Sequence, residues 1–588
     1  MTAWDEGIGL RNAPLLHMML IATLAPLLFF AAGSHLSPAH AVIASEHAGV
    51  RRGHVRRIQA CGALRSANTT YLLTRDVQSP GTCFAIAADN VTLDLNGHTA
   101  TYGVSRQNHP VFGVLSADCW YAPISGNPCG GGHRGIEIMN GRIVQGAGAP
   151  PMSHAIRMGQ GNDFTGIKVH GIDITISAED SIGIYTEYLP GGSDIYDNTI
   201  HNNVTVISNR MQFRGASIKL DNETDAKIPD QIHNNVILGG AQLGIRDDNP
   251  ASTRIYNNDI SQDATYTNGF CIDAAGQNML VYHNHCHPIR GRGIHANHSG
   301  VQIFDNVINV VDSGHNLEYK GCEIHGTYGI QVENDNFNPT DVRVYGNHVT
   351  ARAASCGGDA MRLTDLKGAN IEIYDNTFIA LQDKIDGVYS DRSAFGLSVG
   401  DVIGTHLRFY NNVVQADTAI FYMDWDSGGS ITLADNTFQA GRMGSSTLLA
   451  DFGNGVTPSH DNYFLDNIYQ GISPTSARFG TYSGDSWYGI LETLHVHAQT
   501  SNNAPPHALS GTAIDALNPT PHIGLNDGKG NLTFILPVLR IENQKPPQHF
   551  APYRITLQAP GCNTLDFDLT SPASAPLQRQ LQCGSAGN

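Results

Sequence analysis

The chain has 588 residues, more than the roughly 250–300 at which a single compact core usually divides, so it forms several domains or an elongated repeat array. Hydrophobic residues make up 41% of it and charged residues only 15%, which excludes a disordered chain and a coiled coil. The net charge of −18 argues against a nucleic-acid partner, because such binding needs a basic surface.

The N-terminus is expected to be a signal peptide spanning residues 1–41. An apolar stretch runs from Ala13 to Gly33, and Ala39-His40-Ala41 then offers a small-x-small cleavage site. The stretch is nearly long enough to cross a bilayer, so an uncleaved membrane anchor is the alternative. After cleavage we expect a linker over residues 42–59, no stable membrane span, and a protein that is secreted, periplasmic or held in the cell envelope.

The ten cysteines fall into pairs of near neighbours along the chain. Local pairing favours disulfides formed in an oxidising compartment. The pairing of Cys271 with Cys286 stays open. Cys286 lies in a repeated sequence pattern, at a position where the other copies have a buried apolar residue, so a free thiol in the core would also fit there. The four predicted disulfides are Cys61–Cys83, Cys119–Cys129, Cys322–Cys356 and Cys562–Cys583.

One pattern, apolar-x-x-Asn-x-apolar, recurs ten times through the middle of the chain, with the closest copies 22 residues apart. Such a period is typical of a solenoid whose turns contact only their neighbours, with insertions in the longer turns. Because Asn tolerates the left-handed backbone region, we place it at a bend between strands, where its amide can bond to the next copy. The ten asparagines are Asn198, Asn235, Asn258, Asn284, Asn306, Asn347, Asn376, Asn412, Asn436 and Asn467.

The repeats predict an all-β chain with a right-handed parallel β-helix over residues 60–490. A second pattern, small-apolar-x-apolar, precedes many of the asparagine repeats and is typical of a half-buried strand, as in Gly293-Ile-His-Ala. We assign it to a different sheet of the same coil. Leucine-rich repeats need a Leu consensus that is absent, and a β-propeller needs a steadier period.

The N-terminal segments Tyr71-Leu-Leu-Thr, Gly81-Thr-Cys83-Phe-Ala-Ile and Asp89-Asn-Val-Thr-Leu-Asp-Leu-Asn-Gly-His98 resemble the first coils of right-handed parallel β-helix proteins of the pectate-lyase-like superfamily. The resemblance covers roughly residues 60–490. It implies an extracytoplasmic protein that cleaves, epimerises or binds polysaccharides. Of the polygalacturonase motifs only an Asp-Asp pair, Asp247-Asp248, is present, so that activity is not expected. No pectate-lyase site residue is carried over.

The small-apolar-x-apolar strands place every second residue on the outside of the coil. Neighbouring coils should then line up a mixed-charge row, which suits a linear polymer, and we expect Lys219 and Arg246 to be exposed. A second row, two residues further along each strand, contains Asp221 and Asp248. The first row is predicted to contain Arg157, Tyr185, Lys219, Arg246, Asp273, His295, Gln331, Arg362, Ser398 and Phe421.

This surface predicts an enzyme that cleaves a linear polysaccharide, which could contain uronate units. In β-elimination Lys219 or His295 would be the base and Arg246 would neutralise the carboxylate. Asp221 and Asp248 would hold Ca²⁺, the only cofactor expected. In hydrolysis Asp221, Asp248 and Asp273 are the candidate carboxylates. The predicted catalytic residues are Lys219, Arg246, Asp248, Asp273 and His295, and the predicted substrate-binding residues are Tyr185, Gln331 and Arg362.

Three alternatives stay open. The stacked charges could simply pair across rungs of a solenoid, or the surface could bind carbohydrate without cleaving it in an envelope protein. A periplasmic factor for metalloenzyme maturation is the third, and it would give most weight to His283-Asn-His285-Cys-His287. For that segment we expect a solvated row of imidazoles rather than a metal site. The sequence gives no indication of the oligomeric state.

The asparagine repeat stops at Asn467. A loop-rich linker is expected over residues 491–525, followed by a small β-domain over residues 526–588 that contains Cys562 and Cys583. The domain shows alternating segments such as Leu532-Thr-Phe-Ile-Leu. We expect it to cap the open end of the solenoid or to serve as an accessory domain, because bare edge strands invite aggregation.

Overall fold

The computed structural model describes residues 54–583 with internal gaps. Outside it lie the predicted signal peptide and two predicted disulfides, Cys119–Cys129 and Cys322–Cys356. In the described residues no helix is both long and apolar enough to cross a bilayer. The gaps are residues 118–132, 160–165, 190, 206–214, 223–227, 241–242, 262–268, 290, 312–326, 335–337, 354–356, 386–387, 390–392, 425–430, 454–458, 482 and 573–575.

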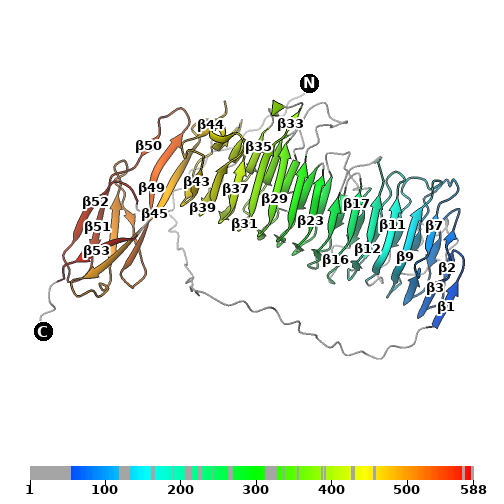
Figure 1. Cartoon of the computed structure of the whole chain (residues 1–588). Coiled ribbons are helices and arrows are strands. Elements are labelled where there is room, and N and C mark those ends of the chain that lie inside the picture. Colours follow the sequence, from blue (N-terminus) through cyan, green and yellow to red (C-terminus); the bar gives the residue numbers. More distant parts are fainter. Residues whose placement is uncertain are drawn as a thin grey trace, which may run out of the picture. The chain divides into compact units, whose positions relative to one another are not determined.

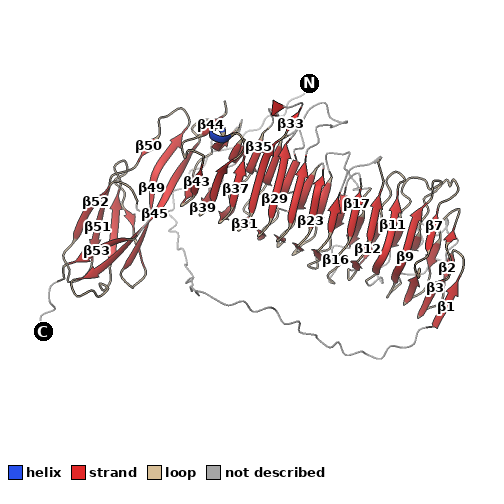
Figure 2. Ribbon diagram, in the orientation of Figure 1, coloured by secondary structure: helices blue, strands red, loops and turns tan. Residues whose placement is uncertain are grey.

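The expected fold class is confirmed: the chain is a parallel β-helix followed by a small β-domain. Figure 1 shows the strands following one another in chain order along the stack, and Figure 2 shows that nearly every element is a strand. Each full rung contributes three strands, two to a 32-stranded sheet, here sheet A, and one to a 15-stranded sheet, here sheet B. The one described helix is the short 3-10 helix η2 (Gly444–Ser446).

Sheet A contains two columns of parallel strands. The first is β1 (His54–Ile58), β3 (Thr69–Leu73), β6 (Val91–Asp94), β9 (Glu137–Gln145), β11 (Lys168–Ile176), β13 (Asp194–Tyr196), β16 (Gln231–His233), β19 (Arg254–Tyr256), β22 (Leu280–Tyr282), β25 (Gln302–Phe304), β28 (Val342–Tyr345), β31 (Asn370–Tyr374), β36 (His406–Tyr410), β39 (Ile431–Ala434), β42 (Asn462–Leu465) and β45 (Trp487–Thr500). The longer strands β9 and β11 run through both columns. The other strands of the second column are β4 (Val77–Gln78), β7 (Thr99–Tyr102), β14 (Thr199–Asn202), β17 (Val236–Gly239), β20 (Asp259–Ser261), β23 (His285–Ile289), β26 (Val307–Val311), β29 (His348–Ala353), β32 (Thr377–Gln382), β37 (Val413–Ala416), β40 (Thr437–Ala440) and β43 (Ile468–Gln470).

Sheet B runs along the remaining side of the coil. A short hairpin, β33 (Lys384–Ile385) with β34 (Val388–Tyr389), lies outside both sheets. The strands of sheet B are β2 (Gly62–Leu64), β5 (Phe84–Ile86), β8 (Val114–Ala117), β10 (Ile156–Gly159), β12 (Ile184–Leu189), β15 (Ile218–Asn222), β18 (Leu243–Asp247), β21 (Phe270–Ala274), β24 (Arg292–Ala296), β27 (Thr327–Glu333), β30 (Gly358–Thr364), β35 (Ala394–Gly400), β38 (Ala419–Asp424), β41 (Leu448–Phe452) and β44 (Ala477–Phe479).

The asparagine of each repeat lies at the bend between the two columns of sheet A. All ten form one continuous ladder, in which each side-chain amide donates to the oxygen of the next asparagine at 2.9–3.1 Å. One detail of the prediction is wrong. The left-handed backbone belongs to the preceding residue, for example Asn257 or Asp305, which frees the asparagine to point inward.

In eight of the ten repeats the residue two positions before the asparagine carries a ring, and these rings, extended by His170 one rung earlier, form a second ladder that the sequence analysis missed. Nine aromatic or imidazole rings stack along the outside of sheet A, with centroids 4.7–5.1 Å apart and planes within 9° of parallel. Because these rings use their faces on one another, they stabilise the stack rather than offer a platform for a ligand. The rings belong to His170, Tyr196, His233, Tyr256, Tyr282, Phe304, Tyr345, Tyr374 and Tyr410.

Three disulfides lie in the described residues: Cys61–Cys83, Cys562–Cys583 and Cys271–Cys286. The first two were predicted. The third settles the open pair, because Cys271 on β21 and Cys286 on β23 both point into the core and join sheet B to sheet A across it.

Replacing both Cys271 and Cys286 with alanine should lower the free energy of unfolding by about 3 kcal/mol, the value for a closed loop of ~15 residues. Urea unfolding followed by circular dichroism measures this. The matched control is the double alanine variant of Cys562 and Cys583, which should leave the β-helix transition unchanged. An unchanged β-helix midpoint in the Cys271–Cys286 variant would contradict the assignment.

The C-terminal domain begins earlier than predicted. Strand β45 pairs with β42 of the last rung and continues without a break into the domain, where it pairs with β49 (Asn531–Glu542). The linker expected over residues 491–525 is therefore wrong in part, since its residues include the end of β45, β46 (Ser510–Ile514) and the core residue Leu494. Similarly, β1 uses residues expected to belong to the linker over 42–59.

The domain is a sandwich of two sheets. β45 and β49 pair with β48 (Leu525–Asn526), β50 (Gln548–His549) and β53 (Leu577–Leu581). Opposite them lie β46, β47 (His522–Ile523), β51 (Tyr553–Gln558) and β52 (Leu565–Leu569). Both sheets contribute to one apolar core, while Leu539 and Ile541 of β49 join the core of the β-helix, as expected of a capping domain.

Candidate functional site

The predicted charged row exists on the outer face of sheet B. Register pairs Tyr185 with Lys219, Lys219 with Arg246, Arg246 with Asp273, and Asp273 with His295 on successive strands. The row continues through Gln331, Arg362 and Ser398. Its last predicted member is wrong: Phe421 points into the core, and Tyr422 pairs with Ser398 in its place.

The second row lies two residues further along each strand. Glu187 and Asp221 are paired on neighbouring strands, and Asp248 directly follows the end of β18, where its backbone N–H donates to the carbonyl of Leu220. Further up the stack Glu333 pairs with Thr364. Neighbouring strands lie about 4.7–4.9 Å apart, so carboxylates on successive rungs of this row lie about one strand spacing apart.

A third outward row, which the sequence analysis missed, lies on the other side of the charged row. It is made by the residue that precedes the small residue of each strand, and that position was the available signal. Its rings lie beside the charged row: Phe270 contacts the His295 imidazole with centroids 4.9 Å apart. The row contains Leu243, Phe270, Arg292, Tyr328, Asp359 and Phe395.

The charged row is buried, and the expectation that Lys219 and Arg246 are exposed is wrong. Lys219 is 7% exposed, and the Arg246 side chain is 16% exposed. Aromatic neighbours cover the row, since Tyr185 lies 5.1 Å from the Lys219 ammonium and packs with Phe270 in a cluster separate from the main core. The outward position on a strand therefore did not mean contact with solvent.

The centre of the site is a buried group formed by Arg246, Asp273 and His295. One oxygen of Asp273 accepts from Arg246, and the other lies 2.9 Å from His295 Nδ1. Burial, the largest influence, raises the pKa of Asp273, but Arg246 and His295 outweigh it and bring the pKa down to about 2. Burial lowers the pKa of Arg246, whereas Asp273, Asp248 and Asp221 raise it, with a net upward shift. Asp273 is therefore ionised and Arg246 is a cation.

Asp221 is held by two neighbours on its own face of sheet B. Its Oδ2 accepts from the Lys219 ammonium at 2.6 Å and from the Tyr185 hydroxyl at 3.2 Å. The side chain of Asp221 is 27% exposed. One edge of this carboxylate is thus fixed by hydrogen bonds while the group still reaches solvent.

The Asp221 and Asp248 pair does not suit Ca²⁺. Calcium takes six to eight oxygen ligands, but here Lys219 uses one Asp221 oxygen, and the Arg246 cation acts on both carboxylates. In the described part of the chain, three metal-ligating side chains approach within 4.8 Å of one another only at Asp259, His285 and His287, on sheet A.

The predicted substrate-binding residues are largely taken up by their neighbours. Gln331 is 2% exposed and donates to Glu333. Arg362 lies 4.8 Å from the Tyr328 ring and 3.2 Å from Asp359. Glu333 also lies 3.6 Å from Arg292 and 3.8 Å from His295 Nε2, so a second outward carboxylate is held beside a guanidinium and an imidazole.

Further along the same face lies a pocket of about 340 Å³ that no motif indicated. Phe395 and Tyr422 stack on one side with centroids 4.0 Å apart, and Phe452 and Phe479 stack on another at 5.0 Å. Asp451, whose side chain is 1% exposed, accepts both guanidinium hydrogen bonds of Arg478. Paired rings beside a fixed ion pair make an amphipathic pocket of the kind that binds small organic ligands.

No protein-family model matches the chain, and no curated protein matches it. The solved structures similar to it include three variants of the tailspike protein of the E. coli bacteriophage HK620. Two are complexes with a pentasaccharide: one has a TM-score of 0.39 and 11% identity, the other a TM-score of 0.38 and 10% identity, and both matches cover 86% of this chain and 87% of the tailspike chain. The third has a TM-score of 0.35 and 11% identity, covering 87% and 86% respectively.

Proposed function

We propose that this chain is an exported, carbohydrate-active β-helix protein that binds a linear polysaccharide along the outer face of sheet B and hydrolyses it. The observation that carries the proposal is the pair of partly exposed carboxylates on neighbouring rungs, Asp221 on β15 and Asp248 just after β18, beside the buried cations Lys219 and Arg246. The cross-linked cysteines support export, because disulfides persist in oxidising compartments. The signal peptide over residues 1–41 belongs to the same proposal.

Hydrolysis fits the geometry better than β-elimination. Elimination needs a base that can reach the substrate, but Lys219 is engaged by Asp221, and His295 is 2% exposed with Asp273 against its Nδ1. The groups that reach outward are carboxylates, which are the acid and base of most glycoside hydrolases. Lys219, Arg246, Asp273 and His295 become positioning residues under the carboxylate row.

Asp221 and Asp248 are assigned different catalytic roles because their neighbouring side chains differ. Lys219 and Tyr185 hydrogen-bond to one oxygen of Asp221 and hold it in place, so we assign Asp221 the role of nucleophile or base and Asp248 the role of acid. Neighbouring strands are about 4.7–4.9 Å apart, close to the ~5–5.5 Å separation of carboxyl groups in retaining glycosidases. We therefore propose hydrolysis with retention at the anomeric carbon.

The substrate that suits this face is a neutral polysaccharide. The cations near the carboxylates are already paired: Arg157 with Glu187, Lys219 with Asp221, and Arg246 with Asp273. A uronate-rich chain would meet outward carboxylates on a protein of net charge −18 and be repelled. Neutral sugars bind through hydrogen bonds from their hydroxyl groups, which the partly exposed carboxylates Asp221 and Asp248 can accept.

Asp248→Asn should lower the rate of polysaccharide hydrolysis by about 10²–10⁴-fold, the usual contribution of a general acid, without unfolding the protein. The assay measures new reducing ends in a panel of neutral and uronate polysaccharides. Asp375→Asn is the matched control, since Asp375 is an exposed carboxylate at the bend between β31 and β32, away from sheet B. Equal rates in wild type and Asp248→Asn would contradict the assigned role.

The same panel of polysaccharides distinguishes hydrolysis from the alternative functions. A product with the ultraviolet absorbance of an unsaturated uronate would overturn hydrolysis in favour of elimination. Sugar binding without any product would favour the second candidate function, a non-catalytic carbohydrate-binding envelope protein. The aromatic pocket at Phe395, Tyr422, Phe452 and Phe479 favours that candidate, and binding should then depend on Tyr422 and Phe479.

A further inference from the structure

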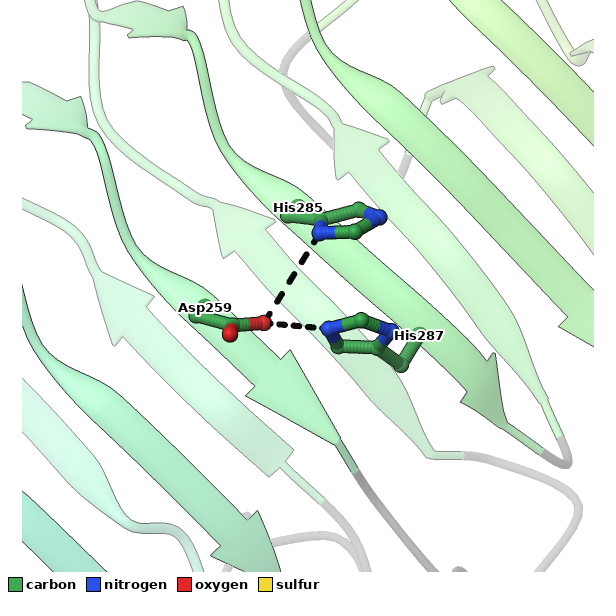
Figure 3. A group of neighbouring side chains, drawn as sticks. All are labelled: Asp259, His285 and His287. Carbon is green, nitrogen blue, oxygen red and sulfur yellow. Dashed lines mark ion pairs between the residues drawn. The ribbon is translucent and has the colours of Figure 1, made fainter.

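Two histidines and an aspartate converge on sheet A, on a different face from the carboxylate row of sheet B. Asp259 lies on β20, and His285 and His287 lie on β23 of the next rung (Figure 3). Asp259 Oδ1 is 2.5 Å from His287 Nε2 and 3.9 Å from His285 Nδ1. One ligand atom from each residue lies within 4.8 Å of the other two. All three side chains are partly exposed, at 36–52%.

The backbone of β23 explains why the two imidazoles meet. The register of β23 against β26 shifts between Cys286 and Ile289, where three steps on β23 span only two on its partner. Such a bulge redirects side chains, and the His285 and His287 rings lie with centroids only 4.0 Å apart. Cys286, between them, is tied to Cys271 through the core, so the strand that carries both imidazoles is fixed in place.

We propose that Asp259, His285 and His287 bind one divalent first-row transition metal ion, with Zn²⁺ as the reference ion. Imidazole nitrogen and carboxylate oxygen are ligands that Zn²⁺ takes at about 2.0–2.2 Å. A tetrahedral ion with such bonds separates its ligand atoms by roughly 3.4 Å, and the two distances from Asp259 Oδ1, 2.5 and 3.9 Å, bracket that value. Small side-chain rotations suffice to complete the site.

The expected alternative for this segment, a row of separately solvated imidazoles, does not describe these two residues. Separate imidazoles would each take their own partner, as His283 does with Asp305 at 3.7 Å. His285 and His287 instead direct nitrogens toward the same oxygen atom of Asp259. His283, the remaining histidine of the motif, lies outside the group.

The proposed ion bridges two rungs and leaves coordination positions open. Asp259 and His285 are paired across neighbouring strands, so the ion would clamp β20 to β23. Three protein ligands leave at least one position for water, as in open zinc sites. Since the site lies on sheet A, the ion takes no part in the proposed chemistry on sheet B. The proposed metal site and the proposed hydrolysis can therefore be tested independently.

Isothermal titration of the full-length protein with Zn²⁺ tests the proposal. We expect one site with a dissociation constant in the micromolar range or tighter, and at least ~10-fold weaker binding in His287→Ala and in Asp259→Asn, each shown to be folded by circular dichroism. His348→Ala is the matched control, since His348 is an exposed histidine of the same outward row two rungs away, and it should bind like wild type. Co²⁺ should give visible absorption bands that His287→Ala lacks.

Two results would overturn the inference. One is wild-type binding weaker than about 1 mM. The other is zinc affinity that is the same in wild type, His287→Ala and Asp259→Asn, which would show an adventitious ion held by other histidines. Polysaccharide cleavage is unaffected in either case, so failure here is distinguishable from failure of the proposed function.

Discussion

Replacing Asn306 with alanine should lower the free energy of unfolding by about 4 kcal/mol. The Asn306 side chain is 1% exposed and sits in the middle of the asparagine ladder. Its amide donates to Val281 and Asn347, and its oxygen accepts from the backbone and side chain of Asn284. Alanine leaves several of these groups buried without a partner, at about 1–3 kcal/mol each.

Two further variants separate hydrogen bonding from shape. Asn306→Asp keeps the size and one acceptor but loses the donor and buries a charge, so it should also destabilise strongly. Asn370→Ala removes an exposed asparagine whose side chain donates a hydrogen bond to Asp341, and it should change stability by less than about 0.5 kcal/mol. Urea unfolding measures all three. A tolerated Asn306→Ala would show that the ladder is not what holds the rungs together.

Asp273→Asn should lower the free energy of unfolding by about 3–5 kcal/mol at neutral pH, because it leaves the buried Arg246 without its charge partner. The same substitution should abolish polysaccharide cleavage, since Asp273 positions Arg246 beneath Asp248 and Asp221. Urea unfolding at neutral pH measures the loss. A matched control is Asp305→Asn, which changes a half-exposed carboxylate at the bend between β25 and β26 and should destabilise the protein far less.

The pH dependence of this difference follows from the lowered pKa of Asp273, about 2 in the folded chain against about 3.9 when unfolded. A lowered pKa contributes stability above the unfolded value and loses it as pH falls through the folded value. The contribution is about 2–3 kcal/mol, complete above about pH 4 and lost toward about pH 2. The gap in stability between wild type and Asp273→Asn should narrow over that window. A gap that stays constant would contradict the ionised Asp273.

The fold could be predicted from the sequence because every repeat contains an asparagine with a defined hydrogen-bonding need, in addition to the regular spacing of its apolar residues. A buried amide must find partners, and an asparagine at every turn finds them in the next turn, so the pattern is visible without structure. The left-handed residue was misplaced by one position because Asp, Asn, His and Gly, which precede the asparagines, tolerate that backbone equally well.

The candidate site was predictable in register but not in burial. Alternation along a strand decides which residues share a face, and it aligned Lys219, Arg246, Asp273 and His295 correctly. The exposure of the charged row depends on the side chains beside it. The sequence analysis did not recognise the third row, which contains Phe270 and Tyr328. Consequently the charges pair with one another beneath aromatic cover, and the carboxylates of the second row become the groups that a substrate can reach.

The most direct test of the central claim is a crystal structure of Asp248→Asn with an oligosaccharide of the substrate bound. The proposal predicts a sugar chain lying along the outer face of sheet B, with a glycosidic bond between the side chains at positions 221 and 248. A chain bound on sheet A, on the C-terminal sandwich, or away from those two positions would contradict it.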